Sequence, residues 1–410
     1  MSVPAIPCEP SREGRKPAGR GDGGLRVLAL EPYFGGSHRA FLDGWRSRSR
    51  HRWTLLTLPA FKWKWRMRNA ALTFADALRA RVRAGQRWDV LWCSDMLDLA
   101  ALRGLAPRPV ADLPAVAYFH ENQLTYPVRH EQERDYHFGY TNMTTALAAA
   151  SVWFNSAFAR DSFLAALPGF LRRMPDDRPE GVVERIAAKA RIMPPGVDPV
   201  PPRGPRRPGP LRILWAARWE HDKNPELFFE AIGRLARAGV AFRLSVIGQR
   251  FRDVPEVFAA ARQAYADRID RWGYQESRAA YVEALRGADV IVSTADHEFF
   301  GLSVVEAILA GAMPLLPRRL SYPEILGDLS PAEAQRCFFD GTAQGLAQKL
   351  VTWAESVRRG EPLPAAAAIR AVEKFTWPRV QSRLDDELEA ITRGAETDGH
   401  GGGPDAPEAQ

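Results

Sequence analysis

Residues 194–210 read PPGVDPVPPRGPRRPGP, and residues 211–219, LRILWAARW, follow them directly. Prolines recur through the first stretch, and because proline lacks a backbone N–H and has a restricted φ, no regular element can run through it. The second stretch is rich in β-branched and aromatic residues, which is typical of a buried strand. Together, these two stretches predict a linker at 194–210 and a new domain that begins at residue 211.

Apolar strands alternate with Ala/Leu/Arg-rich helical stretches on both sides of this linker, which is typical of parallel βαβ units. We therefore expect an α/β protein with two Rossmann-like domains, at 24–193 and 211–376. Their strands should present their carboxyl ends to a central cleft, where ligands bind in such folds. The predicted strands are LRVLAL, RWTLLTL, WDVLWC, AVAYFH and SVWFN in the first domain, and LRILWAARW, AFRLSVIG, DVIVSTA and AMPLLP in the second.

The two ends of the chain have a different composition. Residues 1–23 and 394–410 are rich in Gly, Pro and charge without periodicity, which predicts a disordered N-terminal segment and a disordered tail. Residues 377–393 are expected to form a closing helix. The N-terminus lacks the apolar core of a secretory signal, and the longest apolar run, near Thr144–Phe154, is too short to span a bilayer. We expect a soluble cytoplasmic protein without stable membrane insertion.

The charge distribution indicates the kind of partner, and the cysteine positions exclude two kinds of site. The net charge of the 410 residues is +7, yet residues 39–87 hold 13 Lys or Arg against Asp43 and Asp76, a local excess of +11. Six of the 12 Trp lie in or beside the same window, which favours a polyanionic partner or an anionic membrane surface. The three cysteines are far apart, which excludes a disulfide framework and paired metal ligands: Cys8, Cys93 and Cys337.

The motif EFFGLSVVE, residues 298–306, predicts a phosphate-binding turn in the second domain. Gly301 allows a ligand to approach the backbone closely, and the helix that should begin at Leu302 would aim its free N–H groups at a phosphate. Glu298 and Glu306 bracket this turn. As a hydrolytic acid/base pair they would be poorly placed, because carboxylates in one loop and helix cannot flank a glycosidic bond.

Arg218 and Lys223 follow the first strand of the second domain and precede a helix. Two cations in such a loop can neutralise the charge that develops on a diphosphate leaving group. Taken singly, each could equally be a solvated loop charge. Combined with the glutamates downstream, they indicate a donor-binding site.

At this point the sequence resembles the retaining GT-B glycosyltransferases, which use nucleotide sugars and have two Rossmann-like domains. The resemblance implies that Glu298 contacts the sugar as a catalytic residue and that Glu306 contacts the ribose hydroxyls. It also implies that Arg218, Lys223, Gly301 and Leu302 bind the donor. No Asp-x-Asp pair is present to hold a divalent cation, so we expect an enzyme without a metal or another cofactor.

The first domain has two candidate loops at the ends of strands. Gly35 and Gly36 begin a helix after the first strand, where they could cradle a donor phosphate or simply form a tight turn. In YFHENQLTYP, His120 at a strand end could accept or relay a proton, and the resemblance implies that it contacts the donor sugar. Asn122 and Gln123 are expected to bind the acceptor. His38 is a second candidate, for which a helix-surface role is equally compatible.

The stretch FKWKWRMR, residues 61–68, alternates apolar and basic side chains. We expect an extended segment whose aromatic face packs on the first domain, with base stacking by Trp63 or Trp65 as the less favoured alternative. The basic face would bind the acceptor through Lys62, Lys64, Arg66 and Arg68.

The motifs EPYFGGSH, FKWKWRMR, YFHENQLTYP and RWEHDKNP together resemble the tRNA-queuosine α-mannosyltransferase family over most of residues 25–375. The resemblance implies transfer of mannose from GDP-mannose onto queuosine in the anticodon of tRNA-Asp, with retention of configuration. The alternatives are a GT-B enzyme acting on a lipid or cell-surface glycan, a non-catalytic nucleotide-sugar or RNA-binding module, and a nucleotide-sugar epimerase.

Overall fold

The computed structural model describes residues 24–128, 134–201, 203–250 and 253–399. The chain forms two compact units, residues 1–196 with 380–410 (unit 1) and Val197–Arg379 (unit 2). The predicted segment 1–23, the end of the predicted tail and Cys8 lie outside the described residues.

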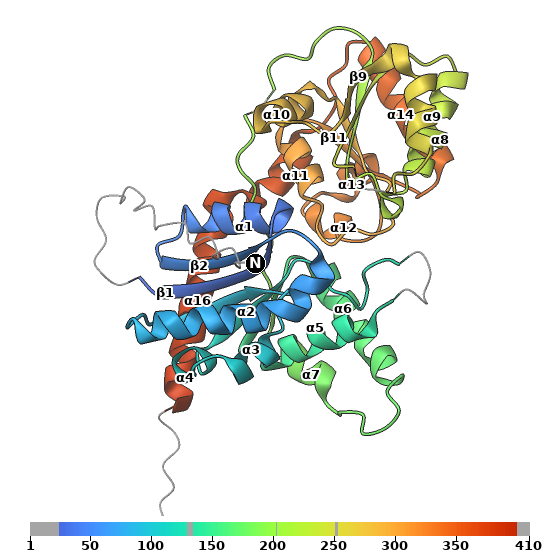
Figure 1. The fold of residues 1–410 in the computed structure, drawn as a ribbon. Coiled ribbons are helices and arrows are strands. Elements are labelled where there is room, and N and C mark those ends of the chain that lie inside the picture. Colours follow the sequence, from blue (N-terminus) through green and yellow to red (C-terminus); the bar gives the residue numbers. More distant parts are fainter. Residues whose placement is uncertain (1–23, 129–133, 202, 251–252, 400–410) are drawn as a thin grey trace, which may run out of the picture. The chain divides into compact units, whose positions relative to one another are not determined.

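Unit 1 is built on a six-stranded parallel sheet with the order β2-β1-β3-β4-β5-β6. Both faces of the central strands are buried, as expected for a parallel sheet covered on both sides. In Figure 1, helix α1 lies on one side of strands β1 and β2, and α2 lies on the other. The strands are β1 (Arg26–Phe34), β2 (Arg52–Pro59), β3 (Val90–Ser94), β4 (Ala115–Phe119), β5 (Ser151–Phe154) and β6 (Ala190–Ile192). The helices are α1 (Gly36–Arg46), α2 (Trp63–Arg83), α3 (Leu99–Leu105), α4 (Arg108–Ala111), α5 (Tyr136–Ala148), α6 (Ala157–Leu171) and α7 (Val182–Ala187).

Unit 2 has a second six-stranded parallel sheet, with the order β12-β11-β10-β7-β8-β9. Read from β9, this is the strand order of the dinucleotide-binding Rossmann fold. Figure 1 shows α10 and α11 on one side of the sheet and α8, α9 and α14 on the other. The strands are β7 (Leu211–Ala216), β8 (Phe242–Ile247), β9 (Ile269–Gly273), β10 (Val290–Val292), β11 (Met313–Pro317) and β12 (Phe338–Phe339). The helical elements are η2 (His221–Lys223), α8 (Pro225–Arg237), α9 (Val257–Ala264), η3 (Ala266–Arg268), α10 (Arg278–Gly287), α11 (Leu302–Leu309), α12 (Tyr322–Ile325), α13 (Pro331–Cys337), α14 (Ala343–Arg358), α15 (Ala366–Val372) and η4 (Glu373–Phe375). The last helix, α16 (Trp377–Gly399), begins in unit 2 and belongs to unit 1 from Val380 onward.

All nine strands predicted from the sequence are present. Strands β6, β9 and β12 were not predicted, because each is short or carries charged residues, as in IDRWG. They lie at the outer edges of the two sheets, where less of a strand needs to be apolar.

The stretch FKWKWRMR is not extended, so the predicted alternation of faces is wrong. Helix α2 begins at Trp63 and runs to Arg83. Trp63, Met67 and Ala70 recur at helical spacing, and Met67 and Ala70 are buried with the rest of the inner face of this helix. Four alternating apolar residues are too short a pattern to outweigh the helical period of the Ala- and Leu-rich sequence that follows.

The Pro-rich segment is attached to unit 2 by two arginines. The buried carboxylate of Asp289 lies 3.1 Å from Arg203 Nη1 and 2.8 Å from Arg206 Nη2, and it also accepts the N–H of Arg212 at 3.0 Å. A buried carboxylate needs such partners to replace its lost water. This part of the chain is therefore anchored although it forms no regular element.

Helix α16 begins at Trp377 and continues past residue 393 to Gly399. From Val380 onward it belongs to unit 1. There the fully buried Asp385 accepts hydrogen bonds from Trp45 Nε1 and Ser49 Oγ, both at 2.8 Å. The C-terminal helix is thus a structural part of the first unit.

Candidate active site

Two loops of unit 2 meet at the point where its strand order reverses. Strands β7 and β10 are neighbours, and from them the chain continues toward opposite edges, to β8 and to β11. In open parallel sheets ligands bind at the carboxyl ends of the strands at such a point. The loop after β7 carries Arg218 and Lys223, and the loop after β10 carries Glu298.

Lys223 lies at the centre of this site. The residue is 5% exposed, its Nζ donates a hydrogen bond to the carbonyl of His297 at 2.6 Å, and the same Nζ lies 3.1 Å from Asp222 Oδ2 and 3.3 Å from Glu298 Oε2. Burying an ammonium group is costly unless such oxygens replace its water. The alternative reading of Lys223 as a solvated loop charge is therefore wrong.

Arg218 remains partly accessible beside it. Its side chain is 38% exposed, and its guanidinium lies 2.9 Å from Glu220 Oε2 and 3.9 Å from Asp222 Oδ2. These carboxylates orient the arginine without removing it from solvent. It could turn toward an incoming anion at little cost, since exposed ion pairs are weak.

The backbone holds the two loops together. The hydroxyl of Thr294 donates to the carbonyl of Lys223 at 2.8 Å, and the N–H groups of Asp296 and His297 donate to the carbonyl of Asp222 at 2.9 and 3.2 Å. These bonds join the loops after β7 and β10. They fix the distance between the ammonium of Lys223 and the carboxylate of Glu298.

Gly301 makes the turn into α11. Its backbone has φ 95° and ψ 50°, the left-handed region that favours glycine. A Cβ at this position would lie 3.1 Å from Cε1 of Tyr322 and 3.6 Å from Cγ of Glu298. The left-handed backbone and the close approach of Tyr322 therefore favour glycine here, and Leu302 begins the helix as predicted.

Glu306 has two partners that were not predicted from the sequence. Its carboxylate lies 2.7 Å from Arg278 Nη2 and accepts the Tyr281 hydroxyl at 2.7 Å. Burial, together with the charge of Glu306, raises the pKa of Tyr281 well above its ordinary value. The spacing RAAY at the start of α10, which puts Arg278 and Tyr281 on one helical face, was the available signal.

His297 is a further site residue that was not predicted from the sequence. Burial and the nearby ammonium of Lys223 lower the pKa of His297 to about 4, against the opposing effect of Asp222 and Glu298. The imidazole is therefore neutral at physiological pH. It adds a polar but uncharged group next to Glu298.

A second cluster lies at the strand ends of unit 1, where β1 and β3 are neighbours and lead to β2 and β4. Glu31, near the end of β1, is completely buried. Its Oε1 accepts the N–H of Tyr33 at 2.8 Å and the hydroxyl of Ser94 at 3.0 Å, and its Oε2 lies 3.2 Å from Nδ1 of His38. His38 is 6% exposed, so the alternative helix-surface role is wrong.

The rings of His38 and His120 lie in contact, with centroids 4.0 Å apart and planes tilted by 32°. Burial alone would lower the pKa of His38, but the carboxylate of Glu31 outweighs it, helped by Asp95 and Glu121, and the pKa rises to about 9. Burial and the cation on His38 lower the pKa of His120 well below its ordinary value. One protonated and one neutral imidazole therefore lie in contact.

Asp95 completes this cluster and was not predicted from the sequence. It is fully buried after β3, and its Oδ1 accepts the N–H of His120 at 2.9 Å. Burial raises the pKa of Asp95 well above its ordinary value, while the charge of His38 opposes the shift. Within the described residues, its Oδ2 and His120 Nε2 are buried without a hydrogen-bond partner.

Gly35 and Gly36 have a structural reason to be glycine. A Cβ at Gly35 would lie 2.4 Å from the Cβ of Ala60, and Gly36 has φ 51° at the start of α1. The turn explains both glycines. Their predicted contact with a donor phosphate stays a prediction.

Asn122 and Gln123 differ in accessibility. Asn122 is 1% exposed, and its Oδ1 accepts the N–H groups of Leu124 and Thr125 at 3.1 and 2.9 Å. This side chain shapes the loop. Gln123 is half-buried, and its Nε2 donates to Glu121 Oε1 at 3.3 Å.

Three of the described residues, Glu31, His38 and His120, could together hold a metal ion, since their ligand atoms lie within 4.8 Å of one another. Two imidazoles and one carboxylate are a common ligand set for transition metals. However, the contacts of Glu31 with Tyr33, Ser94 and His38 already satisfy its oxygens. The expectation of a metal-independent protein stays a prediction.

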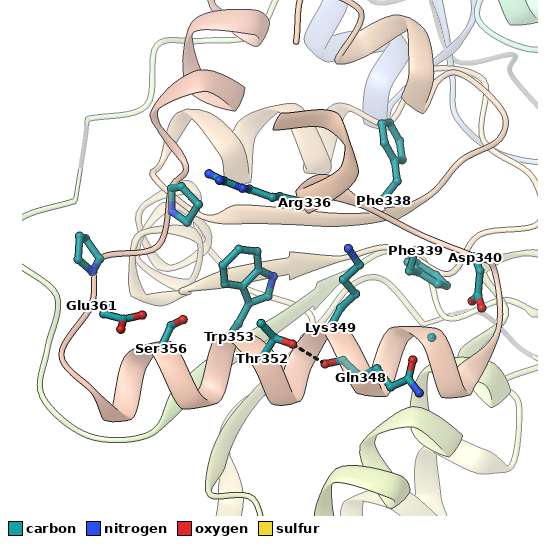
Figure 2. A pocket seen from close by; sticks show the side chains of 13 residues that line it. Arg336, Phe338, Phe339, Asp340, Gln348, Lys349, Thr352, Trp353, Ser356 and Glu361 are labelled. Carbon is teal, nitrogen blue, oxygen red and sulfur yellow. Dashed lines mark hydrogen bonds between the residues drawn. The ribbon is translucent and has the colours of Figure 1, made fainter. Parts of the chain in front are cut away.

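A hollow of about 730 Å³ elsewhere in unit 2 contains none of the predicted site residues. Figure 2 shows Arg336, Lys349 and Trp353 among the side chains that line it, with the acidic Asp340 and Glu361. Its cations and carboxylates are mixed, so its charge selects no ligand class.

Comparisons with known proteins agree with both units. Residues 26–197 match the family described as tRNA-queuosine alpha-mannosyltransferase N-terminal, and residues 176–381 match family 4 glycosyltransferases in conflict systems. The chain is 35% identical over 311 residues to the tRNA-queuosine alpha-mannosyltransferase of Drosophila melanogaster, covering 73% of this chain and 81% of that protein. It is 27% identical to a GDP-mannose-dependent alpha-(1-6)-phosphatidylinositol dimannoside mannosyltransferase of Mycobacterium tuberculosis, over 45% of each chain.

Solved structures confirm the expected GT-B fold. A sucrose-phosphate synthase from Thermosynechococcus elongatus superposes with a TM-score of 0.66, 13% identity, and coverage of 90% of this chain and 100% of that chain. Anabaena HepE, solved in complex with UDP and glucose, superposes with a TM-score of 0.62 and 14% identity. The superposition covers 89% of this chain and 100% of the HepE chain. In the described ranges no helix is both long and apolar enough to cross a membrane. By its sequence match, this chain belongs to the tRNA-queuosine α-mannosyltransferase family.

Proposed function

We propose that the protein transfers mannose from GDP-mannose to queuosine in the anticodon of a tRNA, with retention at the anomeric carbon. The observation that carries the proposal is the contact of Lys223 with Glu298 at the point where the strand order of unit 2 reverses, in a chain of this family. A tRNA acceptor implies that the reaction takes place in the cytoplasm.

The donor would bind to unit 2. The diphosphate needs cations and backbone donors, which Arg218, Lys223 and the N–H groups after Gly301 offer. When a diphosphate binds, the ammonium of Lys223 can form an ion pair with the phosphate in place of its ion pair with Glu298. The carboxylate of Glu298 is then available to accept hydrogen bonds from sugar hydroxyls. Glu306, held by Arg278 and Tyr281, is oriented to accept the ribose hydroxyls.

During transfer the bond from the anomeric carbon to the diphosphate breaks, and a bond from that carbon to an acceptor hydroxyl forms on the same face. The proton of the hydroxyl goes to the departing diphosphate, which gains negative charge as it leaves. Lys223 and Arg218 stabilise that charge, as fixed cations do in phosphate chemistry. We assign no covalent nucleophile to the chain.

The acceptor would bind to unit 1. His120 offers a neutral imidazole at a strand end, because burial and the charge of His38 both lower its pKa. A neutral ring can both donate and accept a hydrogen bond, so it can bind a sugar hydroxyl. Gln123 and the basic residues near the start of α2 are proposed to contact the tRNA.

A turnover experiment tests the proposal. The purified protein is incubated with radiolabelled GDP-mannose, UDP-glucose or UDP-galactose and with tRNA that contains or lacks queuosine. Label should appear only with GDP-mannose and queuosine-containing tRNA. Label on extracted lipids, or release of free mannose without an acceptor, would contradict the proposed acceptor.

A further inference from the structure

Two large aromatic rings are exposed near the start of α2. They belong to Phe61, two residues before the helix begins, and to Trp65, in its first turn. Phe61 is 61% exposed and Trp65 is 59% exposed. Their neighbours behave differently: Met67 is buried, and the ring of Trp63 packs against Phe138 at 5.1 Å. Packing therefore explains Trp63 and Met67 but not Phe61 and Trp65. Exposed aromatic surface of this size beside charge is typical of an interaction site.

Exposed cations surround the two rings, namely Lys62, Lys64 and Arg68. The two acidic residues within residues 39–87 form ion pairs with other arginines: Asp43 with Arg39 and Arg46, and Asp76 with Arg79. Trp65 and Arg68 are three residues apart in the helix and share one face. The guanidinium of Arg68 lies over the ring of Phe138, 4.8 Å from its centroid, and Arg68 and Trp65 are both exposed residues.

We propose that Phe61, Lys62, Lys64, Trp65 and Arg68, here called the α2 platform, bind the unpaired bases of a single-stranded RNA loop. Trp65 stacks on a base, and the cations contact the neighbouring phosphates. This combination of basic groove and aromatic faces suits single strands, whose bases are free to stack on a protein. The inference rests on the proposed function, in which the acceptor nucleoside lies in an anticodon loop.

Two other partners fit the surface less well. Duplex RNA hides its base faces within the helix, so it could use the cations but not the rings. A membrane-surface helix needs a broad apolar face toward the lipid. In α2 that face is buried inside unit 1, through residues that include Met67, Phe74 and Leu78.

The test measures fluorescence anisotropy with three labelled probes: an unmodified anticodon stem-loop RNA, a fully paired RNA duplex of the same length, and anionic phosphatidylserine vesicles. Trp65→Ala should weaken binding of the stem-loop about tenfold or more, the range for removal of one stacked base. Its salt dependence should stay unchanged, because every cation that faces a phosphate is still present. Trp65→Phe should recover most of the affinity, since it restores a ring.

Leu72→Ala is the matched control, because Leu72 is 51% exposed on the same helix but carries no ring. It should bind the stem-loop like the parent protein. The proposal is overturned if Trp65→Ala binds the stem-loop normally, if duplex binding falls equally, or if Leu72→Ala loses as much. Vesicle binding that depends on Trp65 while stem-loop binding does not would indicate a membrane partner instead.

The outcome separates this inference from the proposed function. The binding probes carry no queuosine and require no mannose transfer. If queuosine-containing tRNA is mannosylated but Trp65→Ala changes neither its KM nor the stem-loop affinity, the platform fails and the function stands. If the platform binds loops but no donor yields labelled tRNA, the function fails and the platform stands.

Discussion

The two units share one architecture but differ in what their strand ends carry. In unit 2 the loops after β7 and β10 join a buried lysine to Glu298, with Arg218 exposed beside them. In unit 1, strand β1, helix α1 and the loops after β3 and β4 bring together Glu31, Asp95 and the two neighbouring imidazoles of His38 and His120. The sheet topology explains why both clusters form where the strand order reverses. The side chains decide the chemistry, since cations suit a diphosphate and neutral imidazole suits hydroxyls.

The largest effect is expected in unit 2. Glu298→Gln should lower kcat for mannose transfer by roughly 10²–10³-fold, the range for removal of one preorganised polar group that acts in a transition state. The fold should persist, because the amide oxygen of Gln can still accept a hydrogen bond from Lys223 Nζ. Steady-state turnover and circular dichroism measure the two effects. Glu230→Gln, on the exposed surface of α8, is the control, and unchanged turnover of Glu298→Gln would remove Glu298 from the donor site.

A smaller effect is expected from the basic surface of unit 1. Replacing Lys62, Lys64 and Arg68 with Gln should weaken tRNA binding at least tenfold and reduce the slope of log K against log salt by about one unit for each phosphate that the protein no longer neutralises. Arg66 is left in place because its Nε donates to the carbonyl of Pro59 at 3.1 Å. Filter binding across a salt series provides the slope.

The matched control removes three charges from unit 2, by replacing the exposed Arg237, Arg262 and Arg358 with Gln. Its affinity and slope should equal those of the parent protein. If the two triple variants lose the same affinity, net charge and not the surface near α2 accounts for tRNA binding.

The stability of the unit 1 cluster, a different quantity from binding or turnover, should depend on pH. The folded pKa of His38, about 9, is raised above its ordinary value of 6.5. Its stabilising contribution is therefore complete below pH 6.5 and is lost as the pH rises through 9. The shift corresponds to about 3 kcal/mol. It depends on the groups facing the ring, which are Glu31, Asp95, Glu121 and His120.

Urea titrations at pH 6.5 and pH 9 measure this effect. The parent protein should lose stability between these values relative to His38→Gln, which cannot be protonated. A parallel pH dependence of the two proteins would show that His38 is not charged in the folded state, and would leave burial as the only cause of a lowered pKa of His120.

Removal of metal ions is expected to have no effect on the transfer rate. Because Glu31 is satisfied by Tyr33, Ser94 and His38, treatment with EDTA should leave the transfer rate unchanged. Elemental analysis of the purified protein should find no stoichiometric transition metal. A bound ion whose removal stops transfer would instead identify Glu31, His38 and His120 as a metal centre.

The loops proposed to bind the donor could be located from sequence because each predicted residue stands within a short motif. Arg218 and Lys223 follow a clear strand, and Glu298 precedes a glycine that a tight turn requires. Local spacing carried no information on Asp95 or Glu31. These lie among apolar strand residues, and only the parallel pairing of β1 with β3 and of β3 with β4 brings them to His38 and His120.

The local sequence pattern also could not predict the partners of Glu306 or the conformation of residues 61–68. Arg278 and Tyr281 reach Glu306 from a different helix. The alternation in FKWKWRMR suits a strand locally, but the following residues make one long helix that buries Met67 and exposes Trp65.

The sequence by itself determined the alternation of strands and helices, the break at the Pro-rich segment and the family of the chain, because these depend on residue order and local periodicity. The tertiary structure decided which distant side chains meet. It paired Lys223 with Glu298, placed His38 against His120 and left Phe61 and Trp65 in solvent. The physical reason is that strand register and helix packing set such contacts, and both depend on the whole core.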